Sequence, residues 1–262
     1  MGALVPSSTT SIATIQEDSP ARIALGKSGN ALPVKARAEL ATDHAQARDA
    51  VHAEVDIARI QEQLHAAGWS DMTVVDSQAT TREEYLTRPD LGRLPAHLPP
   101  ELKDSHAATI GVLLIDGLSP TAVMDHGVAT IQALKETLPK NLTMAPPIIV
   151  RQGRVALGDH IAALCGWDVC IVLIGERPGL SVPSSLGMYL TWKAIPGTTD
   201  ERRNCISNIH PPEGTSYKEA ALVAADLIAQ FTEKSTSGYM IKAADAQRLL
   251  EELESNSAQA LN

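Results

Sequence analysis

The sequence predicts an α/β protein in which a helical region precedes an open, mostly parallel sheet. From residue 109 onward, apolar runs alternate with helical patterns. Residues 34–67 carry Ala, Leu, Ile and Val at three- and four-residue spacings, whereas residues 1–33 are rich in Ser, Thr, Pro and Gly without clear periodicity. We therefore divide the chain into a flexible or wrapping arm (1–33), a helical region with a connector (34–95) and a sheet domain with C-terminal helices (96–262).

The helical region is predicted to hold two helices. Their apolar spacing runs through residues 34–67, and Gly68 is a suitable C-terminal stop because glycine readily adopts a left-handed conformation. The segment that follows at 81–95, TREEYLTRPDLGRLP, is polar and interrupted by Pro and Gly. We expect it to be a connector and a hinge between the two parts.

Three apolar runs predict the central strands, at residues 109–119, 146–154 and 168–176. Near-continuous apolar runs of this kind are typical of parallel strands that are covered on both faces. Ser119 and Pro120 are expected to begin a helix as N-cap and first-turn residue, with Ala122, Val123, Ile131 and Leu134 on its apolar face, and residues 156–166 predict the next helix. This βαβαβ spacing predicts an open sheet.

The remaining elements follow from shorter patterns. Residues 187–194 and 203–209 are candidate strands, and residues 216–234 predict an amphipathic helix with Ser216 as its cap and Glu219 three residues later. Residues 243–255, AADAQRLLEELES, also have a helical pattern.

Composition limits the possible functions. The chain has 22 basic and 31 acidic residues, a net charge of −9, and only 3% aromatic residues, which argues against nucleic acid as a partner. No run of 18 apolar residues predicts a membrane helix. Cys165, Cys170 and Cys205 lack paired spacing, so we expect small buried hydrophobes in a reducing, intracellular location.

The predicted strand ends are the places to look for a ligand, because open parallel sheets bind ligands outside the carboxyl ends of their strands. They carry DGLSP, RQGRV and GERPGLS, but no GxGxxG joins a strand to a helix. GxSxG and HExxH are also absent, and His44 and His52 are expected to be solvated helix residues. A set of glycine, proline and polar residues near these strand ends suits a broad, amide-bearing ligand better than a reacting centre. The set consists of Gly153, Pro178, Gly179 and Gly187 beside Arg154, Glu176, Arg177 and Asn208.

Five separated motifs, in order, give the chain a family resemblance. They are EYLTRPD (84–90), DGLS (116–119), GRV (153–155), GERPGL (175–180) and CISNIH (205–210). The chain resembles the small subunit of ethanolamine ammonia-lyase from about Ala21 to Leu227, while the first and last segments diverge.

The resemblance implies a Rossmann-like domain that closes over adenosylcobalamin at the interface with a large catalytic subunit. The complex converts ethanolamine to acetaldehyde and ammonia, the substrate lies mainly in the large subunit, and this chain alone is expected to be inactive. By the same resemblance, Val155, Glu176 and Cys205 match cofactor-contacting positions. The implied location is cytoplasmic, with a bacterial microcompartment as a further option.

Each of these three residues also has a simpler interpretation. Glu176 can accept a charge-assisted hydrogen bond from an amide of the corrin rim, or it can pair with Arg154 or Arg177 at the surface. Val155 is equally consistent with core packing, and Cys205 with a buried small hydrophobe. Two other functions stay open: a nucleotide-dependent oxidoreductase, favoured by the α/β pattern, and a non-enzymatic assembly adaptor, favoured by the arm and the helical region.

Overall fold

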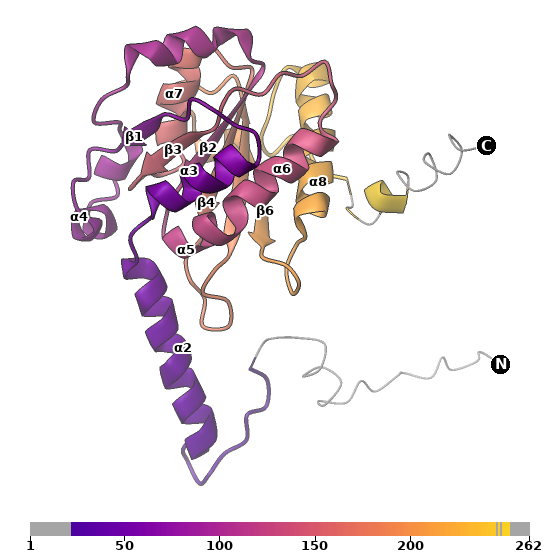
Figure 1. Cartoon of the computed structure of the whole chain (residues 1–262). Helices are drawn as coiled ribbons and strands as arrows, with labels where there is room; N and C mark the ends of the chain where they lie inside the picture. The colour runs from indigo at the N-terminus through magenta and orange to yellow at the C-terminus, as the bar shows by residue number, and fades with distance from the viewer. Residues whose placement is uncertain (1–21, 245, 247, 252–262) are drawn as a thin grey trace, which may run out of the picture.

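Six strands form a single sheet in the order β1-β3-β2-β4-β5-β6. The structure, a computed structural model, describes residues 22–244, 246 and 248–251 (Figure 1). The strands are β1 (Val74–Asp76), β2 (Ile110–Ile115), β3 (Ile148–Arg151), β4 (Val169–Gly175), β5 (Leu186–Trp192) and β6 (Arg203–Ile209). The predicted α/β class with a mostly parallel sheet is confirmed.

Strand direction places most strand ends at one edge of the sheet. β1, β3, β2 and β4 are parallel, β5 is antiparallel to β4, and β6 is antiparallel to β5. β6 therefore runs in the same direction as β4. The carboxyl ends of every strand except β5 lie at one edge, which we call the carboxyl edge, and β5 begins there.

The core lies on both faces of the sheet, as the continuous apolar runs predict. Every residue of β2 is buried, with Ile110, Val112 and Leu114 in one apolar cluster and Leu113 and Ile115 in the other. The first cluster includes residues of α3 (Ile57–Ala66), α6 (Val128–Thr137) and α8 (Tyr217–Lys234), and the second includes residues of α7 (Leu157–Cys165).

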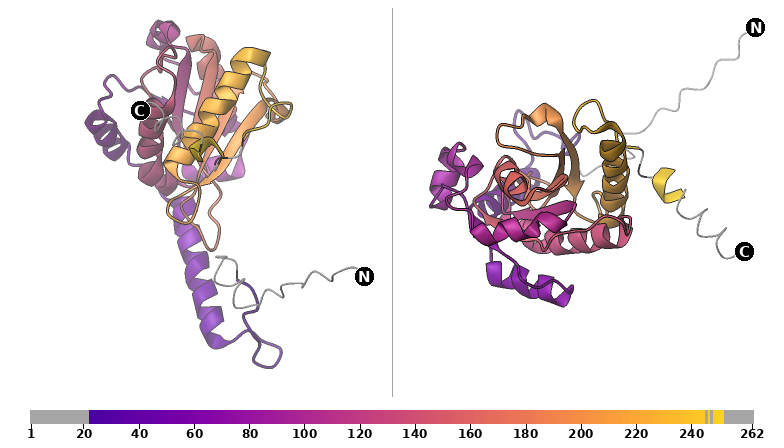
Figure 2. Two further views of the ribbon diagram at one scale, coloured as in Figure 1. Left: turned by 90° about the vertical axis from the view of Figure 1, so that its right-hand side faces the viewer. Right: turned by 90° about the horizontal axis from the view of Figure 1, so that it is seen from above.

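The helical region contains the two predicted helices, α2 (Val34–His52) and α3. Gly68 has a φ of +82° just beyond α3, which confirms its role as a stop. α2 extends away from the α/β body at the end where the 176–185 loop emerges (Figures 1 and 2). Of its residues, Ala36, Ala47 and Ala50 are buried.

Local capping explains where several helices begin. The Ser119 hydroxyl accepts a hydrogen bond from the backbone N–H of Ala122, and the short α5 (Pro120–Ala122) follows. α8 begins with the predicted capping box, in which Ser216 and Glu219 each accept from the other's backbone N–H.

Some elements differ from the sequence expectations. β1 has only three residues and was not predicted, and a π-helical turn, η3 (Val123–Gly127), interrupts the helix that begins at Pro120. The expected connector contains a helix, α4 (Arg82–Thr87), and a 3-10 turn, η1 (Leu91–Arg93). Two further 3-10 segments are η2 (Pro100–Ala107) and η4 (Asp200–Arg202).

The predicted C-terminal helix and the predicted N-terminal arm lie only partly within the described residues. Ala246 and residues 248–251 are helical, while 245, 247 and 252–255 of the predicted C-terminal helix lie outside the described residues. The predicted arm is described only from residue 22, and the domain boundaries stay predictions.

Candidate functional site

The switch point of the sheet is closed. β2 and β4 are neighbours whose chains continue in opposite directions across the sheet, and a crevice between their carboxyl ends is the usual ligand site of such folds. Here the backbone N–H of Leu118 donates to the carbonyl of Gly175 at 2.9 Å. A Cβ on Gly175 would lie only 2.0 Å from the Ser119 carbonyl oxygen, so the two loops touch directly. This packing, like the missing glycine motif, argues against a bound dinucleotide.

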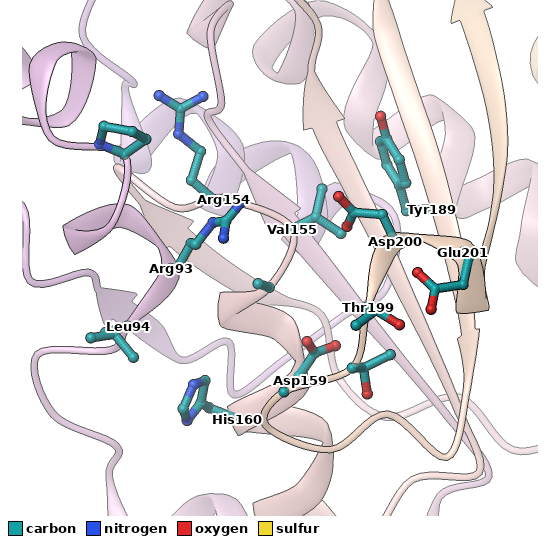
Figure 3. Close-up of a pocket in the computed structure, with 14 residues that line it drawn as sticks. Arg93, Leu94, Arg154, Val155, Asp159, His160, Tyr189, Thr199, Asp200 and Glu201 are labelled. Atoms are coloured by element: carbon teal, nitrogen blue, oxygen red, sulfur yellow. The ribbon is translucent and has the colours of Figure 1, made fainter. Parts of the chain in front are cut away.

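A hollow of about 700 Å³ lies beside the closed switch point (Figure 3). It is bounded by the start of α7, by β5 and by the loop between β5 and β6. Val155, one of the three predicted site residues, lines it together with Arg154 and Tyr189. Val155 also packs against the α7-side cluster, which confirms its core-packing interpretation, while its contact with a cofactor stays a prediction.

Cys205 lies opposite Tyr189 in the β5–β6 ladder. Burial raises the pKa of Tyr189 to about 12, and the neighbouring Cys205 adds to this shift. Partial desolvation of the sulfur by its neighbours and the nearby Glu176 charge raise the pKa of Cys205, which favours the thiol over the thiolate. Cys165 and Cys170 are buried as expected, but the same expectation for Cys205 is wrong: it is exposed because it faces the uncovered side of β6.

Glu176 follows the last residue of β4, and its carboxylate is held from two sides. The Ser185 hydroxyl donates to Oε2 at 2.6 Å, and the backbone N–H of Asn208 donates to the same oxygen at 3.4 Å. Neither Arg154 nor Arg177 forms an ion pair with Glu176, so the surface-pairing interpretation is wrong. Gly187 leaves room for the carboxylate, since a Cβ there would lie 2.9 Å from Oε1.

The three predicted site residues therefore surround one region. Val155 and Tyr189 line the hollow, Tyr189 pairs with Cys205, and the charge of Glu176 acts on both Tyr189 and Cys205. We call the surface formed by Val155, Glu176, Tyr189 and Cys205 the open face. Tyr189 was missed by sequence reasoning, although its place between the apolar residues Met188 and Leu190 hints that it faces the other side of the strand.

Arg154 links the open face to the motif at 84–90. The ring of Tyr85, which is fully buried, contacts the guanidinium groups of both Arg82 and Arg154, at 4.8 and 4.3 Å from the ring centre. Arg154 also donates to the Tyr85 carbonyl at 3.2 Å. The EYLTRPD segment is therefore structural, since it fixes the residue that precedes Val155.

Asp116 supports the same edge from the end of β2. Its carboxylate accepts hydrogen bonds from the backbone N–H groups of Gly117, Gln152 and Gly153. Burial raises the pKa of Asp116 to about 6, against the opposing effects of these donors and of Arg82. Its contacts are all within the protein, so its part in the site is to join two strand ends.

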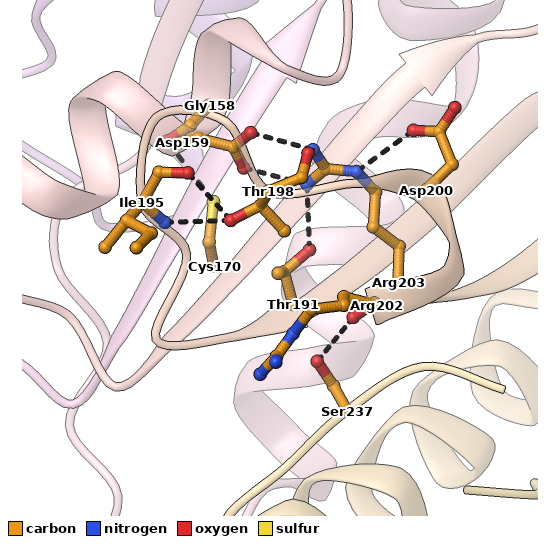
Figure 4. Close-up of polar contacts among 10 residues, drawn as sticks. All are labelled: Gly158, Asp159, Cys170, Thr191, Ile195, Thr198, Asp200, Arg202, Arg203 and Ser237. Carbon is orange, nitrogen blue, oxygen red and sulfur yellow. Dashed lines mark hydrogen bonds and ion pairs between the residues drawn. The ribbon is translucent and has the colours of Figure 1, made fainter. Parts of the chain in front are cut away.

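A buried ion pair supports the far side of the hollow (Figure 4). Arg203 of β6 donates to both carboxylate oxygens of Asp159 in α7, at 2.8 and 2.7 Å. Its side chain also donates to the Thr198 carbonyl at 2.8 Å and pairs with Asp200 at 3.3 Å. The pair thus fastens the β5–β6 loop, which lines the hollow, to α7.

The loop between β4 and β5 is held at its tip and at its base. Arg22 forms an ion pair with Asp43 of α2 and donates to the Leu180 carbonyl at 3.3 Å. At the base, Nε2 of His126 lies 3.3 Å from the Ser184 hydroxyl, and Nδ1 lies 2.9 Å from the Tyr217 hydroxyl. Burial lowers the pKa of His126, which favours the neutral ring. His126 belongs to the π-helical turn, an irregularity often found at functional sites.

Within the part of the chain that the structure describes, no three His, Cys, Asp or Glu side chains cluster in a way that could hold a metal ion. No helix among those residues is long and apolar enough to cross a membrane. The fold and the site define an α/β protein with a closed switch point and an uncovered face on its edge strands, a class distinct from the dinucleotide-binding enzymes.

Comparison with known proteins identifies the family. The family described as Ethanolamine ammonia-lyase light chain (EutC) matches residues 9–242. The ethanolamine ammonia-lyase small subunit of Rhodococcus erythropolis is 47% identical over 228 residues, covering 87% of this chain and 88% of the relative. The corresponding protein of Rhodopseudomonas palustris (strain BisA53) is 44% identical over 239 residues, 88% and 90% of the two chains, and that of Azotobacter vinelandii is 43% identical over 230 residues, 85% and 84%.

The chain therefore belongs to the ethanolamine ammonia-lyase light chain family, and the resemblance drawn from the five motifs is confirmed. The match is longer than those motifs suggested, because it begins within the predicted arm and reaches residue 242.

Proposed function

We propose that this chain is the cofactor-binding small subunit of an adenosylcobalamin-dependent ethanolamine ammonia-lyase and that it holds the corrinoid between its open face and the large catalytic subunit. The proposed complex converts ethanolamine to acetaldehyde and ammonia. Family membership supports the enzyme class, and the observation that carries the cofactor assignment is the fixed carboxylate of Glu176 beside an uncovered sheet face. In this proposal the sheet domain is Rossmann-like in layout but binds its ligand away from the usual crevice.

The residues present fit a corrinoid. A corrin rim carries primary amide side arms, and Glu176 Oε1 can accept from an amide N–H, because both hydrogen bonds described for this carboxylate go to Oε2. A hollow of about 700 Å³ suits a drug-sized molecule, and a corrinoid is several times larger. A cofactor of this size would be covered only in part by this chain, which supports a shared interface.

The cofactor, when bound, supplies the radical chemistry, and the protein supplies binding, orientation and shielding. Val155 and the aromatic ring of Tyr189 would cover apolar parts of the ligand. Glu176 would fix the rotation of the corrin by binding one rim amide. Cys205, as a neutral thiol, would contribute a small polarizable contact without a charge.

The decisive experiment compares this chain, the large subunit and their complex. Absorption titration with adenosylcobalamin and an assay of ammonia release should show tight binding and turnover only for the complex. Robust turnover by this chain alone would overturn the proposal, and so would binding of NAD(P) in place of the corrinoid. A large subunit that is fully active alone would instead favour the assembly adaptor.

Location is a separate part of the proposal. We infer a cytoplasmic enzyme, with a bacterial microcompartment as the alternative location, and the role of residues 1–33 in targeting is the point to test. A fluorescent protein fused to these residues should concentrate in microcompartment shells if they direct the enzyme there, and diffuse fluorescence would contradict this role.

A further inference from the structure

Asn208 has an unusual backbone conformation next to Glu176. Its φ is +64°, in the left-handed region that asparagine tolerates better than most residues, and it lies where the β5–β6 register shifts between Leu186 and Met188. This local irregularity aims the Asn208 backbone N–H at Glu176 Oε2, 3.4 Å away. Asn208 is therefore an immediate neighbour of the carboxylate.

The Asn208 side chain is held in one orientation. Nε2 of the buried His210 lies 2.7 Å from Asn208 Oδ1. An amide oxygen only accepts, so Nε2 of His210 carries the hydrogen and donates it. The backbone is fixed as well, because the N–H of Thr215 donates to the Asn208 carbonyl at 2.8 Å.

The His210 ring itself has little freedom to move. A Cβ on Gly214 would lie 2.7 Å from two ring atoms, so the turn backbone packs directly against the imidazole. This packing fixes the orientation of the imidazole ring, and its Nε2–H group stays hydrogen-bonded to Asn208 Oδ1. The Nδ2 group of Asn208 is consequently the free end of the amide, and the residue is exposed.

Glu176 and Asn208 are joined through the Asn208 backbone N–H, and each has one polar group with no described hydrogen bond, an acceptor on Glu176 and a donor on Asn208. Oε2 of Glu176 is occupied by Ser185 and Asn208, while the hydrogen bonds described for the pair leave Oε1 and Nδ2 without a partner. A primary carboxamide has the complementary groups, an N–H₂ donor and a C=O acceptor. A carboxylate in the same place would meet the negative charge of Glu176 and be repelled.

We propose that Glu176 and Asn208 act as a pair that recognises one primary carboxamide of the corrin rim, with Glu176 accepting from its N–H₂ and Asn208 Nδ2 donating to its C=O. The inference rests on the proposed cofactor role and adds to it a specificity residue, Asn208, and a chemical preference for an amide over a carboxylate arm. His210 is a positioning residue that acts only through Asn208.

The test uses the complex with the large subunit and measures corrinoid affinity by absorption titration, together with the thermal midpoint of the cofactor-free complex. Asn208→Gly keeps the positive φ and the backbone N–H to Glu176; it removes the amide and, with it, the acceptor of the buried His210. Asn141→Gly is the matched control, because Asn141 is an exposed turn residue that precedes β3 at the opposite edge of the sheet. Asn208→Asp keeps the shape and replaces the donor with an acceptor.

Asn208→Gly should weaken adenosylcobalamin binding about three- to tenfold, the usual value of one neutral hydrogen bond, and should lower the thermal midpoint because His210 loses its acceptor; Asn208→Asp keeps that acceptor and should leave the midpoint unchanged. Asn208→Asp should weaken binding at least as much, and Asn141→Gly should have no effect. The wild-type complex should also prefer adenosylcobalamin over cobalamins with one side-arm amide hydrolysed to the acid, and Glu176→Gln should reduce that preference for one of the regioisomers.

Unchanged affinity in both Asn208 variants overturns the inference and leaves the proposed function intact. A loss of affinity accompanied by an equal loss of thermal stability in both variants also overturns it, because the role would then be structural. Failure of the wild-type complex to bind any corrinoid refutes the proposed function itself, so the two failures are distinguishable.

Discussion

Replacing Asp159 with asparagine should strongly destabilise the chain, because it leaves the Arg203 charge buried without its main partner. The two side chains are only 2% and 3% exposed, and both guanidinium N–H groups bind the carboxylate in a fork. The Asp200 carboxylate also reaches Arg203 at 3.3 Å, but it is 91% exposed and therefore screened by water.

The expected loss of unfolding free energy in Asp159→Asn depends on the burial of Arg203 more than on the lost contact itself. Breaking a buried pair by removing one partner costs about 3–5 kcal/mol, because the other charge stays desolvated. The exposed Asp200 and the Thr198 carbonyl offset part of this loss, so we expect about 3 kcal/mol. That value corresponds to a change of roughly a hundredfold in the unfolding equilibrium.

Asp76→Asn is a matched control for the effect of burial. Asp76 binds Arg151 through the same two-pronged geometry, at 2.5 and 2.8 Å, but the two side chains are 48% and 49% exposed. Exposed pairs contribute about 0–1 kcal/mol, so this variant should be almost as stable as the wild type.

The assay is urea unfolding of the purified chain, followed by far-ultraviolet circular dichroism and by tryptophan fluorescence, with coincident transitions required. Asp159→Asn should shift the midpoint to lower urea without changing the slope. Equal small effects from Asp159→Asn and Asp76→Asn would refute the reasoning, because burial would then not decide the cost.

Three further predictions test the site. Glu176→Gln keeps the side-chain shape and removes the charge assistance, so it should weaken cobalamin binding by about 1–2 kcal/mol with little change in the Michaelis constant for ethanolamine; the reverse pattern would contradict its cofactor role. The pKa of Asp116 is raised to about 6 in the fold, above its unfolded value of about 3.9, so its stabilisation is complete below pH 4 and is lost as the pH rises through 6. Relative to Asp116→Asn, the wild type should therefore lose roughly 3 kcal/mol of unfolding free energy between pH 4 and 7, and a pH-independent difference would show that the carboxyl is ionised throughout. Cobalamin should keep its own dimethylbenzimidazole on cobalt, because the sequence contains no Asp-x-His-x-x-Gly motif; electron paramagnetic resonance of the cob(II)alamin state with nitrogen-15-labelled protein should show no change in superhyperfine splitting.

Local sequence patterns predicted most of the sheet and its helices for a physical reason. β2, β3 and β4 are buried on both faces, which requires the continuous apolar runs seen in the sequence. The cap of α8 is equally local, since Ser216 and Glu219 are three residues apart. β1 escaped prediction because three residues carry too little pattern to distinguish a strand from a loop.

The contacts that shape the site could not be predicted because they join distant parts of the chain. Arg203 and Asp159 are separated by 44 residues, and neither residue type indicates burial by itself. The left-handed Asn208 depends on a register shift against β5, which appears only when the strands are paired. Glu176, by contrast, was predictable as a strand-end residue, although its partners Ser185 and Asn208 were not.

The two faces of β5 and β6 differ in how they are covered. The helical segments that contact β5 and β6, α8 and η3, belong to one face, where Met188, Leu190 and Ile206 are buried in the apolar cluster. The opposite face carries Tyr189 and Cys205, and the helix on that side, α7, packs over β4 and reaches the start of β6 through the Asp159–Arg203 pair. A ligand bound to this face would contact β5 and β6 with one of its sides, and these strands would leave its other side uncovered. Glu176, whose carboxylate is fixed by two donors, lies beside this face, so the proposed corrinoid would contact β5 and β6 here and the proposed large subunit would cover its other side.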